Sequence, residues 1–360
     1  MKAKKKYEFN PDYAIPPGET LRELMETLQM TQKDLADRVG LTVQTLNRIF
    51  KGEQPITYET ANKLELVTGT PARVWNNLEM QYREQLAKII DKTNLEKDSN
   101  WLKTVPVKEL AQRGFIKEQN DKSFIIREVF SFYGVANVDA WREIWENPQI
   151  EARRSACFET QPGSASTWIR QGELQAQEIM CKPYDKKQFV KTLNEIRNLT
   201  KGKSDAFVAE MKKLCADTGV ALALVKEMKK VPWNGATKWI SPDKAMILLS
   251  LRGKGEDKFW FSFFHEAAHV LHGSKRHLYI ADNSNDPEEV KADIFAADFL
   301  IPEEYNDRIK SCTSENEIIE IASDLNISPG IVAGRYQFLT KRWSYFKNLI
   351  HKFEWVDSEP

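Results

Sequence analysis

The sequence has little histidine and cysteine, and it lacks a long apolar run. Of its 360 residues only five are histidine and four are cysteine. Apolar stretches such as Ala245–Leu251 fall far short of the roughly 20 residues that a membrane-spanning helix needs. The cysteines form no CxxC pair, so we expect reduced, mostly buried side chains rather than a disulfide framework. These cysteines are Cys157, Cys181, Cys215 and Cys312.

The chain also lacks an excess of either charge, since Lys plus Arg and Asp plus Glu both number 52. This balance argues against general attraction to nucleic acid or to a membrane surface. The basic start, Met1–Lys6, is followed by Tyr7 and Glu8 rather than by the apolar segment of a secretory signal. We therefore expect a soluble, cytoplasmic protein with no membrane partner. Its length predicts two or three units, each with its own core.

Helix signals dominate the first ninety residues. Thr31 can cap a helix, with Asp34 in capping-box position and Gly40 as its end. Thr42 can cap the next helix, which Gly52 ends. Similar signals predict five short helices, at about 20–28, 31–39, 42–51, 57–67 and from 71 onward.

Two short capped helices joined by a tight glycine turn are typical of the motif that lays its second helix in a DNA major groove. The third helix exposes side chains able to bond base edges, with no acidic residue among them. They are Gln44, Thr45, Asn47, Arg48 and Lys51. The alternative is a protein-interaction module, because residues 1–98 hold fifteen basic and fifteen acidic residues and nonspecific attraction to DNA should be weak.

Three separated motifs, Pro16–Leu21, Met30–Ala36 and Ile56–Ala61, resemble the HigA-type antitoxin branch of the Cro/lambda repressor-like (XRE) proteins. The resemblance covers about Ile15 to Leu86. It implies a five-helix domain that binds a double-stranded DNA operator as a homodimer, often with a toxin as partner. It also implies a phosphate contact from Gln32, at the start of the second helix.

The middle of the sequence predicts helices but no activity. Asp91–Asn100 is polar and reads as a linker or a solvated helix end, which suggests domains at 1–95, 96–205 and 206–360. Large aromatic residues dominate burial in helical packing, so we expect Trp141, Trp145 and Trp168 to be core residues. A sensor, a dimerisation element and a plain scaffold all fit this helical connecting domain.

Four of the five histidines fall within thirteen residues: His265, His269, His272 and His277. They include the segment His265-Glu266-Ala267-Ala268-His269. On a helix, residues 265 and 269 lie one turn apart on one face, so their imidazoles can hold one ion, and Glu266 can face a water on that ion. A lone HExxH segment on a solvated helix can also arise by chance.

Catalytic zinc takes about three protein ligands and leaves one position open, so a further ligand must come from elsewhere. Glu289 is the best candidate, at the start of a second helix that stops at Pro302. Asp293, four residues later, can accept the other ring proton of a zinc histidine. The rival His272 would lie about 10 Å along the helix axis from His265, too far for one ion.

Five further segments complete the pattern around these helices: Gly219–Leu222, Ala245–Arg252, Phe259–Phe261, Ala292–Ala297 and Gly334–Gln337. Together they resemble the ImmA/IrrE family of metallopeptidases over about Asp217 to Leu339. Asp293 stands where the family commonly has Asn, and Ala-Ala separates the histidines instead of the frequent Leu-Gly. Neither departure removes a ligand or the base.

This second resemblance implies a gluzincin-like site in which His265, His269 and Glu289 bind Zn²⁺. Glu266 would take a proton from the water at the metal and deliver it to the leaving amine. The donor that stabilises the tetrahedral oxyanion stays open among four side chains. They are His272, His277, Tyr279 and Tyr305.

We therefore predict a mainly α protein, in which an all-α helix-turn-helix domain and a helical middle region precede an α+β zincin-like domain with a small sheet. The leading hypothesis is a DNA-binding regulator fused to a zinc endopeptidase. Its substrate would be a repressor-type protein, itself included, or a cognate toxin. The alternative is a HigA-like antitoxin and autorepressor in which zinc is structural or the last domain neutralises a toxin.

Overall fold

The computed structural model describes residues 12–146, 161–202, 207–275, 278–280 and 286–355. Cys157 and His277 lie outside these residues. The contacts divide the chain into two compact units, which are described separately. The first unit comprises Met1–Ser99 and Gln119–Arg127, and the second comprises Asn100–Glu118 and Glu128–Pro360. None of the described helices combines the length and hydropathy needed to cross a membrane.

The first unit contains the five predicted helices. They are α1 (Pro17–Thr27), α2 (Gln32–Val39), α3 (Val43–Phe50), α4 (Tyr58–Thr68) and α5 (Ala72–Lys97). The predicted caps are present: the Thr31 and Thr42 side chains accept from backbone N–H groups three residues on, and Gly40 adopts the left-handed conformation. Leu21, Leu35, Leu46 and Trp75 form the centre of one buried core.

Helix α5 is longer than predicted. It continues through residues 91–97, where the sequence suggested a linker or a solvated helix end, and it passes into the 3-10 turn η1 (Asp98–Thr104). The linker reading is therefore wrong for this stretch. Polar side chains interact along this stretch, where Lys97 donates to Asn94 at 3.3 Å and Arg127 pairs with Asp91 at 3.3 Å.

Helices make up the first part of the second unit. They are α6 (Val107–Gln112), α7 (Lys122–Tyr133, which begins in the first unit), α8 (Val138–Trp145), α10 (Pro162–Glu178), α11 (Lys186–Asn198), η2 (Leu199–Lys201) and α12 (Phe207–Ala216). Trp141, Trp145 and Trp168 are buried, which confirms the prediction that they are core residues. Trp101 and Trp141 meet edge to face with ring centroids 5.3 Å apart.

A small mixed sheet lies at the centre of the second unit. Its strands are β1 (Val220–Leu224), β2 (Gly235–Ser241), β3 (Lys244–Leu249) and β4 (Leu278–Ile280), in the order β1-β3-β2-β4. Strands β1 and β3 are parallel, whereas β2 runs antiparallel to both β3 and β4. The mainly α fold with one small sheet is as predicted.

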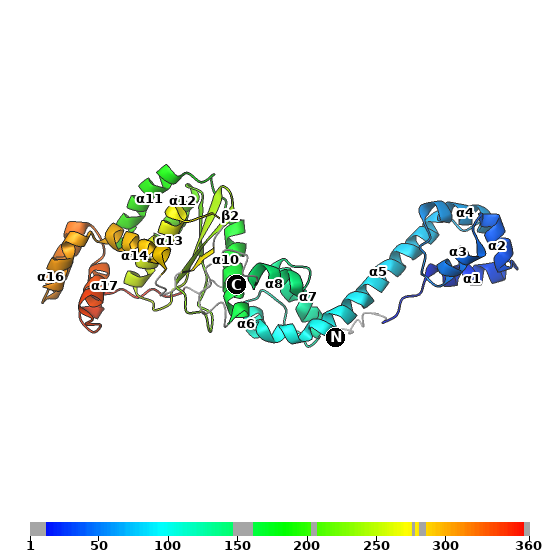
Figure 1. The fold of residues 1–360 in the computed structure, drawn as a ribbon, viewed down its shortest axis with the longest axis horizontal. Helices are drawn as coiled ribbons and strands as arrows, with labels where there is room; N and C mark the ends of the chain where they lie inside the picture. The colour runs from blue at the N-terminus through cyan, green and yellow to red at the C-terminus, as the bar shows by residue number, and fades with distance from the viewer. Residues whose placement is uncertain (1–11, 147–160, 203–206, 276–277, 281–285, 356–360) are drawn as a thin grey trace, which may run out of the picture. The chain divides into compact units, whose positions relative to one another are not determined.

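Helices cover both faces of this sheet. In Figure 1, α10 lies on one side of β2, while α12 and α13 (Glu256–His272) lie on the other. Side chains alternate accordingly, since Leu222 and Ile247 join the core on the α13 side and Leu248 packs against Gly172 of α10. Helix α14 (Pro287–Leu300) packs along α13. Helix α13, which carries the HExxH segment, therefore lies between the sheet and α14.

The last part of the chain also packs on α13. It contains η3 (Glu303–Tyr305), α15 (Asn306–Lys310), α16 (Glu315–Leu325), α17 (Pro329–Thr340) and η4 (Lys347–Leu349). Helix α17 contacts α13 directly. The backbone N–H of Glu256, at the start of α13, donates to the carbonyl of His351 at 2.9 Å. The N-terminal end of α13 is thus in contact with the segment around His351.

Candidate metal centre

Two helices bring three buried donor groups together. His265 and His269, one turn apart on α13, are each 3% exposed, and Glu289 in the first turn of α14 is 7% exposed. The Nε2 atoms of the two histidines are 3.2 Å apart. Glu289 Oε2 lies 3.0 Å from His265 Nε2, and its Oε1 lies 3.2 Å from His269 Nε2. The sequence-predicted ligand set therefore converges on one point.

A fourth side chain fixes the orientation of His265. Its Nδ1 atom lies 2.8 Å from Asp293 Oδ1, so Nδ1 carries the proton and Nε2 of a neutral ring presents a lone pair. That lone pair faces the Glu289 carboxylate. A lone pair and a carboxylate repel each other at 3.0 Å unless a proton or a metal ion lies between them. His265 Nε2 and Glu289 are therefore placed to share one.

The pKa values of the buried groups reflect the same arrangement. Burial alone would lower the pKa of His265, but its hydrogen bonds to Asp293 and Glu289 raise it to about 10. Burial would raise the pKa of Glu289, but hydrogen bonds from His265 and His269 lower it to about 2. The same contacts thus favour positive charge on His265 and negative charge on Glu289.

The donor set fits zinc. Ligand bonds of about 2.0–2.1 Å in tetrahedral geometry place donor atoms about 3.3 Å apart, close to the 3.0–3.2 Å separations between the His265, His269 and Glu289 atoms. Two histidines and one glutamate are also the ligands of a common class of catalytic zinc site. These residues could hold Zn²⁺ with little rearrangement.

Glu266 lies beside this cluster and is fully buried. The Thr237 hydroxyl donates to its Oε2 atom at 2.6 Å, whereas Oε1 has no hydrogen-bond partner among the described residues. Burial raises the pKa of Glu266 to about 7. Its carboxylate therefore has one oxygen tied to the sheet and one available for proton transfer near neutral pH.

Gly235 explains how a carboxylate fits at this point. A Cβ atom at residue 235 would lie only 2.5 Å from Glu266 Oε1, so any larger residue would displace the acid. Neither Gly235 nor Thr237 was identified from the sequence. They lie on β2, about thirty residues before the HExxH segment, and no strand was predicted there.

The candidate oxyanion donors differ in position. The Tyr279 ring stacks on that of His269, with centroids 4.3 Å apart and planes 12° apart. Its hydroxyl accepts from the Ser274 backbone N–H at 2.7 Å. His272 is exposed and meets the Phe295 ring edge to face, with centroids 5.8 Å apart. Of these two side chains, only Tyr279 contacts a candidate metal ligand, namely His269.

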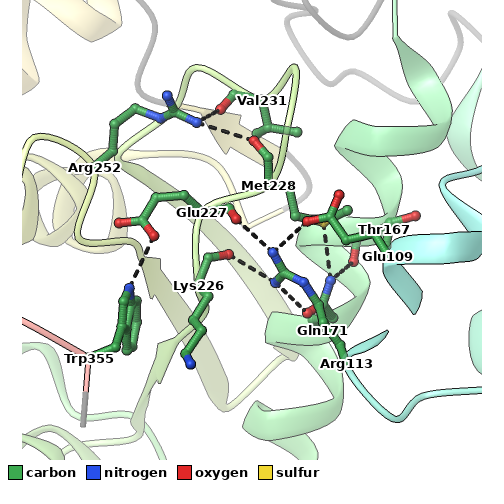
Figure 2. Close-up of polar contacts among 10 residues, drawn as sticks. All are labelled: Glu109, Arg113, Thr167, Gln171, Lys226, Glu227, Met228, Val231, Arg252 and Trp355. Carbon is green, nitrogen blue, oxygen red and sulfur yellow. Dashed lines mark hydrogen bonds and ion pairs between the residues drawn. The ribbon is translucent and has the colours of Figure 1, made fainter. Parts of the chain in front are cut away.

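The loop that leads into Gly235 is fixed by two arginines, as Figure 2 shows. Arg113 donates to the carbonyls of Lys226 and Glu227 at 3.0 and 2.6 Å. Arg252 donates to the carbonyl of Met228 at 3.2 Å. Bonds from charged donors to backbone carbonyls are among the stronger hydrogen bonds. The strand that carries Gly235 and Thr237 therefore starts from a well-fixed point.

The sequence-predicted DNA-contacting residues gather on α2 and α3 of the first unit. Gln44, Asn47, Arg48 and Lys51 are exposed, whereas Gln32 and Thr45 are half-buried. The hydroxyl of Thr45 lies 2.9 Å from that of Thr42, the cap of α3. The exposed members can reach a groove without any change in the core.

Comparison with known families agrees with both halves. Residues 21–75 match the helix-turn-helix family, and residues 223–336 match the family described as IrrE N-terminal-like domain. The chain carries a helix-turn-helix domain and an IrrE N-terminal-like domain. Both resemblances expected from the sequence are thereby confirmed. The IrrE N-terminal-like domain includes β2, β3, β4, α13 and α14, which bear the three candidate metal ligands together with Glu266, Thr237 and Tyr279.

Individual relatives cover the helix-turn-helix part. An uncharacterised HTH-type transcriptional regulator of Escherichia coli (strain K12), YddM, is 29% identical over 63 residues, which are 18% of this chain and 67% of the regulator. An addiction module antidote protein of a HigA family from Coxiella burnetii is 30% identical. It covers 24% of this chain and 94% of its own, with a TM-score of 0.22.

Proposed function

We propose that this protein is a DNA-binding transcriptional regulator whose IrrE N-terminal-like domain is a zinc-dependent endopeptidase. One observation supports the enzymatic part above all. His265, His269 and Glu289 converge within 3.2 Å of one another, and the neighbouring Glu266 keeps one carboxylate oxygen without a partner among the described residues.

The chemistry divides between the metal and the side chains. Zn²⁺, when bound, would lower the pKa of a water molecule to about 7 and polarise a peptide carbonyl. His265 and His269 would bind it as neutral rings, with Asp293 holding the His265 proton on Nδ1. Glu289 supplies the negative charge that favours a divalent cation over a proton.

Glu266 would act as the general base and acid. Its Oε1 atom accepts a proton from the attacking water and then delivers that proton to the leaving amine nitrogen. Thr237 keeps Oε2 in place meanwhile. Because burial raises the pKa of Glu266 to about 7, the group can both take and release a proton at neutral pH.

The first unit would direct this activity to gene control. The exposed Gln44, Asn47 and Arg48 side chains of α3 suit base edges in a double-stranded operator, and operators of this motif usually bind a homodimer. We propose a cytoplasmic regulator that cleaves a repressor-type protein, itself included, or a toxin partner. The resemblance of about Ile15 to Leu86 to HigA-type antitoxins motivates the toxin as a substrate to be tested.

The test compares the full-length protein with Glu266→Gln after loading both with zinc. Each is incubated with the protein itself, with related repressors and with the products of neighbouring genes, and cleavage is followed by mass spectrometry. Glu266→Gln should keep zinc content and operator binding while losing at least a hundredfold in cleavage rate, as removal of a general base does. Equal cleavage by both proteins rejects the peptidase assignment.

A second candidate is a HigA-like antitoxin and autorepressor whose zinc holds the domain together. The burial of His265, Glu266 and His269, each 3% exposed or less, favours it, because a buried metal that joins α13 to α14 would hold the core of the domain together. Chelation would then unfold the second unit, because binding free energy becomes folding free energy. Glu266→Gln would leave toxin neutralisation and repression intact.

A further inference from the structure

We infer that Thr237 and Tyr279 form a cross-strand pair that positions Glu266 and His269. The inference rests on the proposed peptidase function and identifies residues that act through the site rather than on the substrate. Thr237 on β2 and Tyr279 on β4 are register partners in the antiparallel ladder. Partners in such a ladder project from the same face of a sheet, and both residues reach α13.

Thr237 controls the carboxylate. It is fully buried, and its hydroxyl lies 2.6 Å from Glu266 Oε2 and 3.1 Å from the Glu266 backbone carbonyl. Two residues earlier on the same strand face, Gly235 leaves the space that Oε1 occupies. Thr237 thus donates a hydrogen bond to Oε2, and the lack of a side chain at Gly235 leaves space for Oε1. Together they favour a single orientation of the Glu266 carboxylate.

Tyr279 controls the imidazole. Its ring is 3% exposed and lies nearly parallel to that of His269 at a centroid distance of 4.3 Å. The hydroxyl already accepts from the Ser274 N–H, so the contact with His269 is made by the ring face. A flat partner at this distance fixes the plane of the imidazole and hence the direction of its Nε2 lone pair.

The short strand β4 makes the two effects interdependent. Among the described residues it pairs with β2 at three positions: Ala236 with Ile280, Thr237 with Tyr279 and Lys238 with Leu278. A slip of one residue would turn Tyr279 to the opposite face of the sheet. The ladder register therefore sets where the base stands relative to the zinc-binding histidine.

The Thr237 half is tested by a double-mutant cycle in thermal unfolding of the metal-free full-length protein, with no enzymatic readout. Thr237→Val leaves the buried carboxylate without its bond and should lower the Tm by about 5 °C. In a Glu266→Ala background the same change should cost about 1 °C, and Thr237→Ser should restore most of the loss. Equal losses in both backgrounds overturn the assignment.

A matched control comes from Thr218, which is 1% exposed and donates to the carbonyl of Cys215 at 2.8 Å. Thr218→Val removes an equally buried hydroxyl away from Glu266. Its cost should be the same with and without Glu266. A Thr218 effect that depends on Glu266 as strongly as the Thr237 effect does would mean that general destabilisation explains both.

The Tyr279 half is tested by competition of the full-length protein with a chelator for Zn²⁺. Tyr279→Leu removes the ring and should weaken zinc binding about tenfold, as loss of outer contacts to a ligand does. Tyr279→Phe keeps the ring and should weaken binding much less. Equal weakening by both variants, or no weakening by Tyr279→Leu, overturns the stacking role.

Cleavage assays then separate this inference from the proposed function. Thr237→Val should lower kcat about tenfold with little change in KM, and Thr237→Ser should recover it. If Glu266→Gln abolishes cleavage but Thr237→Val shows neither coupling nor a kcat effect, the pair is not a positioning device and the peptidase stands. If Glu266→Gln cleaves normally, the peptidase assignment fails whatever the Thr237 cycle gives.

Discussion

Helices α2 and α3 in the first unit, and α16 and α17 in the second, are each a pair of capped helices joined through a single left-handed residue. In the first unit, Thr31 and Asp34 form a capping box on α2, and Gly40 turns the chain with φ 71°. In the second unit, Ser314 and Glu317 form a capping box on α16, and Asn326 turns the chain with φ 58°. The next helices begin at matching caps, on Thr42 for α3 and Ser328 for α17.

The hydrogen bonds of the two turns also correspond. Leu41 N–H donates to Ala36 at 2.9 Å, and Ile327 N–H donates to Ala322 at 3.0 Å. Their surroundings differ, however. Gln44, two residues after its cap, is exposed on α3, whereas Gly330, at the equivalent place on α17, is buried.

Packing causes this difference. Helix α17 lies against α13, and a Cβ atom on Gly330 would lie 1.9 Å from Glu256 Oε1. No base edge could reach that face. The comparison of the two turns shows that helix caps and one left-handed residue are enough to form the backbone of a helix-turn-helix. Whether the second helix is exposed enough to contact DNA depends on what packs against it.

Removal of zinc should produce the largest difference in local stability between the α2–α3 turn and the α16–α17 turn. Because α17 packs on the helix that carries His265 and His269, chelation should destabilise the second unit by about 4 kcal/mol when free zinc had been a thousandfold above its Kd. Hydrogen exchange measured by mass spectrometry should then speed up at Val332 and stay unchanged at Leu46. Equal acceleration in both units contradicts a metal site confined to the second.

A substitution at the equivalent positions should have the next largest effect. Gly330→Ala forces a methyl group against Glu256 and should cost about 3 kcal/mol of unfolding free energy, at the upper end for overpacking. Gln44→Ala should stay within about 0.5 kcal/mol, as exposed changes do. Urea titration of each full-length variant measures both values, and a tolerant Gly330 would mean that α17 is not held against α13.

Operator binding should depend on the α2–α3 turn and not on the α16–α17 turn. Arg48→Ala should weaken binding to the operator about 5- to 150-fold, since a base-edge contact contributes about 1–3 kcal/mol. Arg335→Ala removes an arginine of α17 that donates to Asn306 at 3.0 Å and should leave binding unchanged. Electrophoretic mobility shifts at fixed salt provide the measurement. A comparable loss for Arg335→Ala would assign DNA contacts to the second turn as well.

Removal of a helix cap should have the smallest effect on the unfolding free energy, and the effect should be about equal at Thr42 and Ser328. Thr42 accepts from the Thr45 N–H at 3.0 Å, and Ser328 accepts from the Gly330 N–H at 3.3 Å. Thr42→Ala and Ser328→Ala should each cost about 1 kcal/mol of unfolding free energy. Denaturation curves of the two variants test this. A cost in only one of them would show that the two turns differ in local construction as well as in exposure.

Local signals explain how much of the fold could be predicted. Capping side chains and glycine ends located α2 and α3 because they act within a few residues of one another. The spacing of His265, His269, Glu289 and Asp293 placed them on two helix faces, and the two helices lie side by side. Such periodic and short-range patterns are legible in a single chain.

The unpredicted features depend on tertiary contacts. Thr237 bonds to Glu266 across 29 positions of sequence, and nothing in its neighbourhood distinguishes it from other strand threonines. The stacking of Tyr279 on His269 depends on the register of β4. The burial of α17 likewise follows from the position of α13. Single-chain patterns report which face is apolar, but they do not report what lies against it.

The attachment of Glu266 to the sheet has a consequence for regulation of the chemistry. All three candidate ligands come from the helices α13 and α14, whereas the bond that orients the base comes from β2. A small sliding of the helix pair over the sheet would leave the ligands together and carry the base out of alignment. In the proposed peptidase, the grouping of the ligands therefore depends on the contact between two helices, whereas the alignment of the base depends on the contact between helix and sheet.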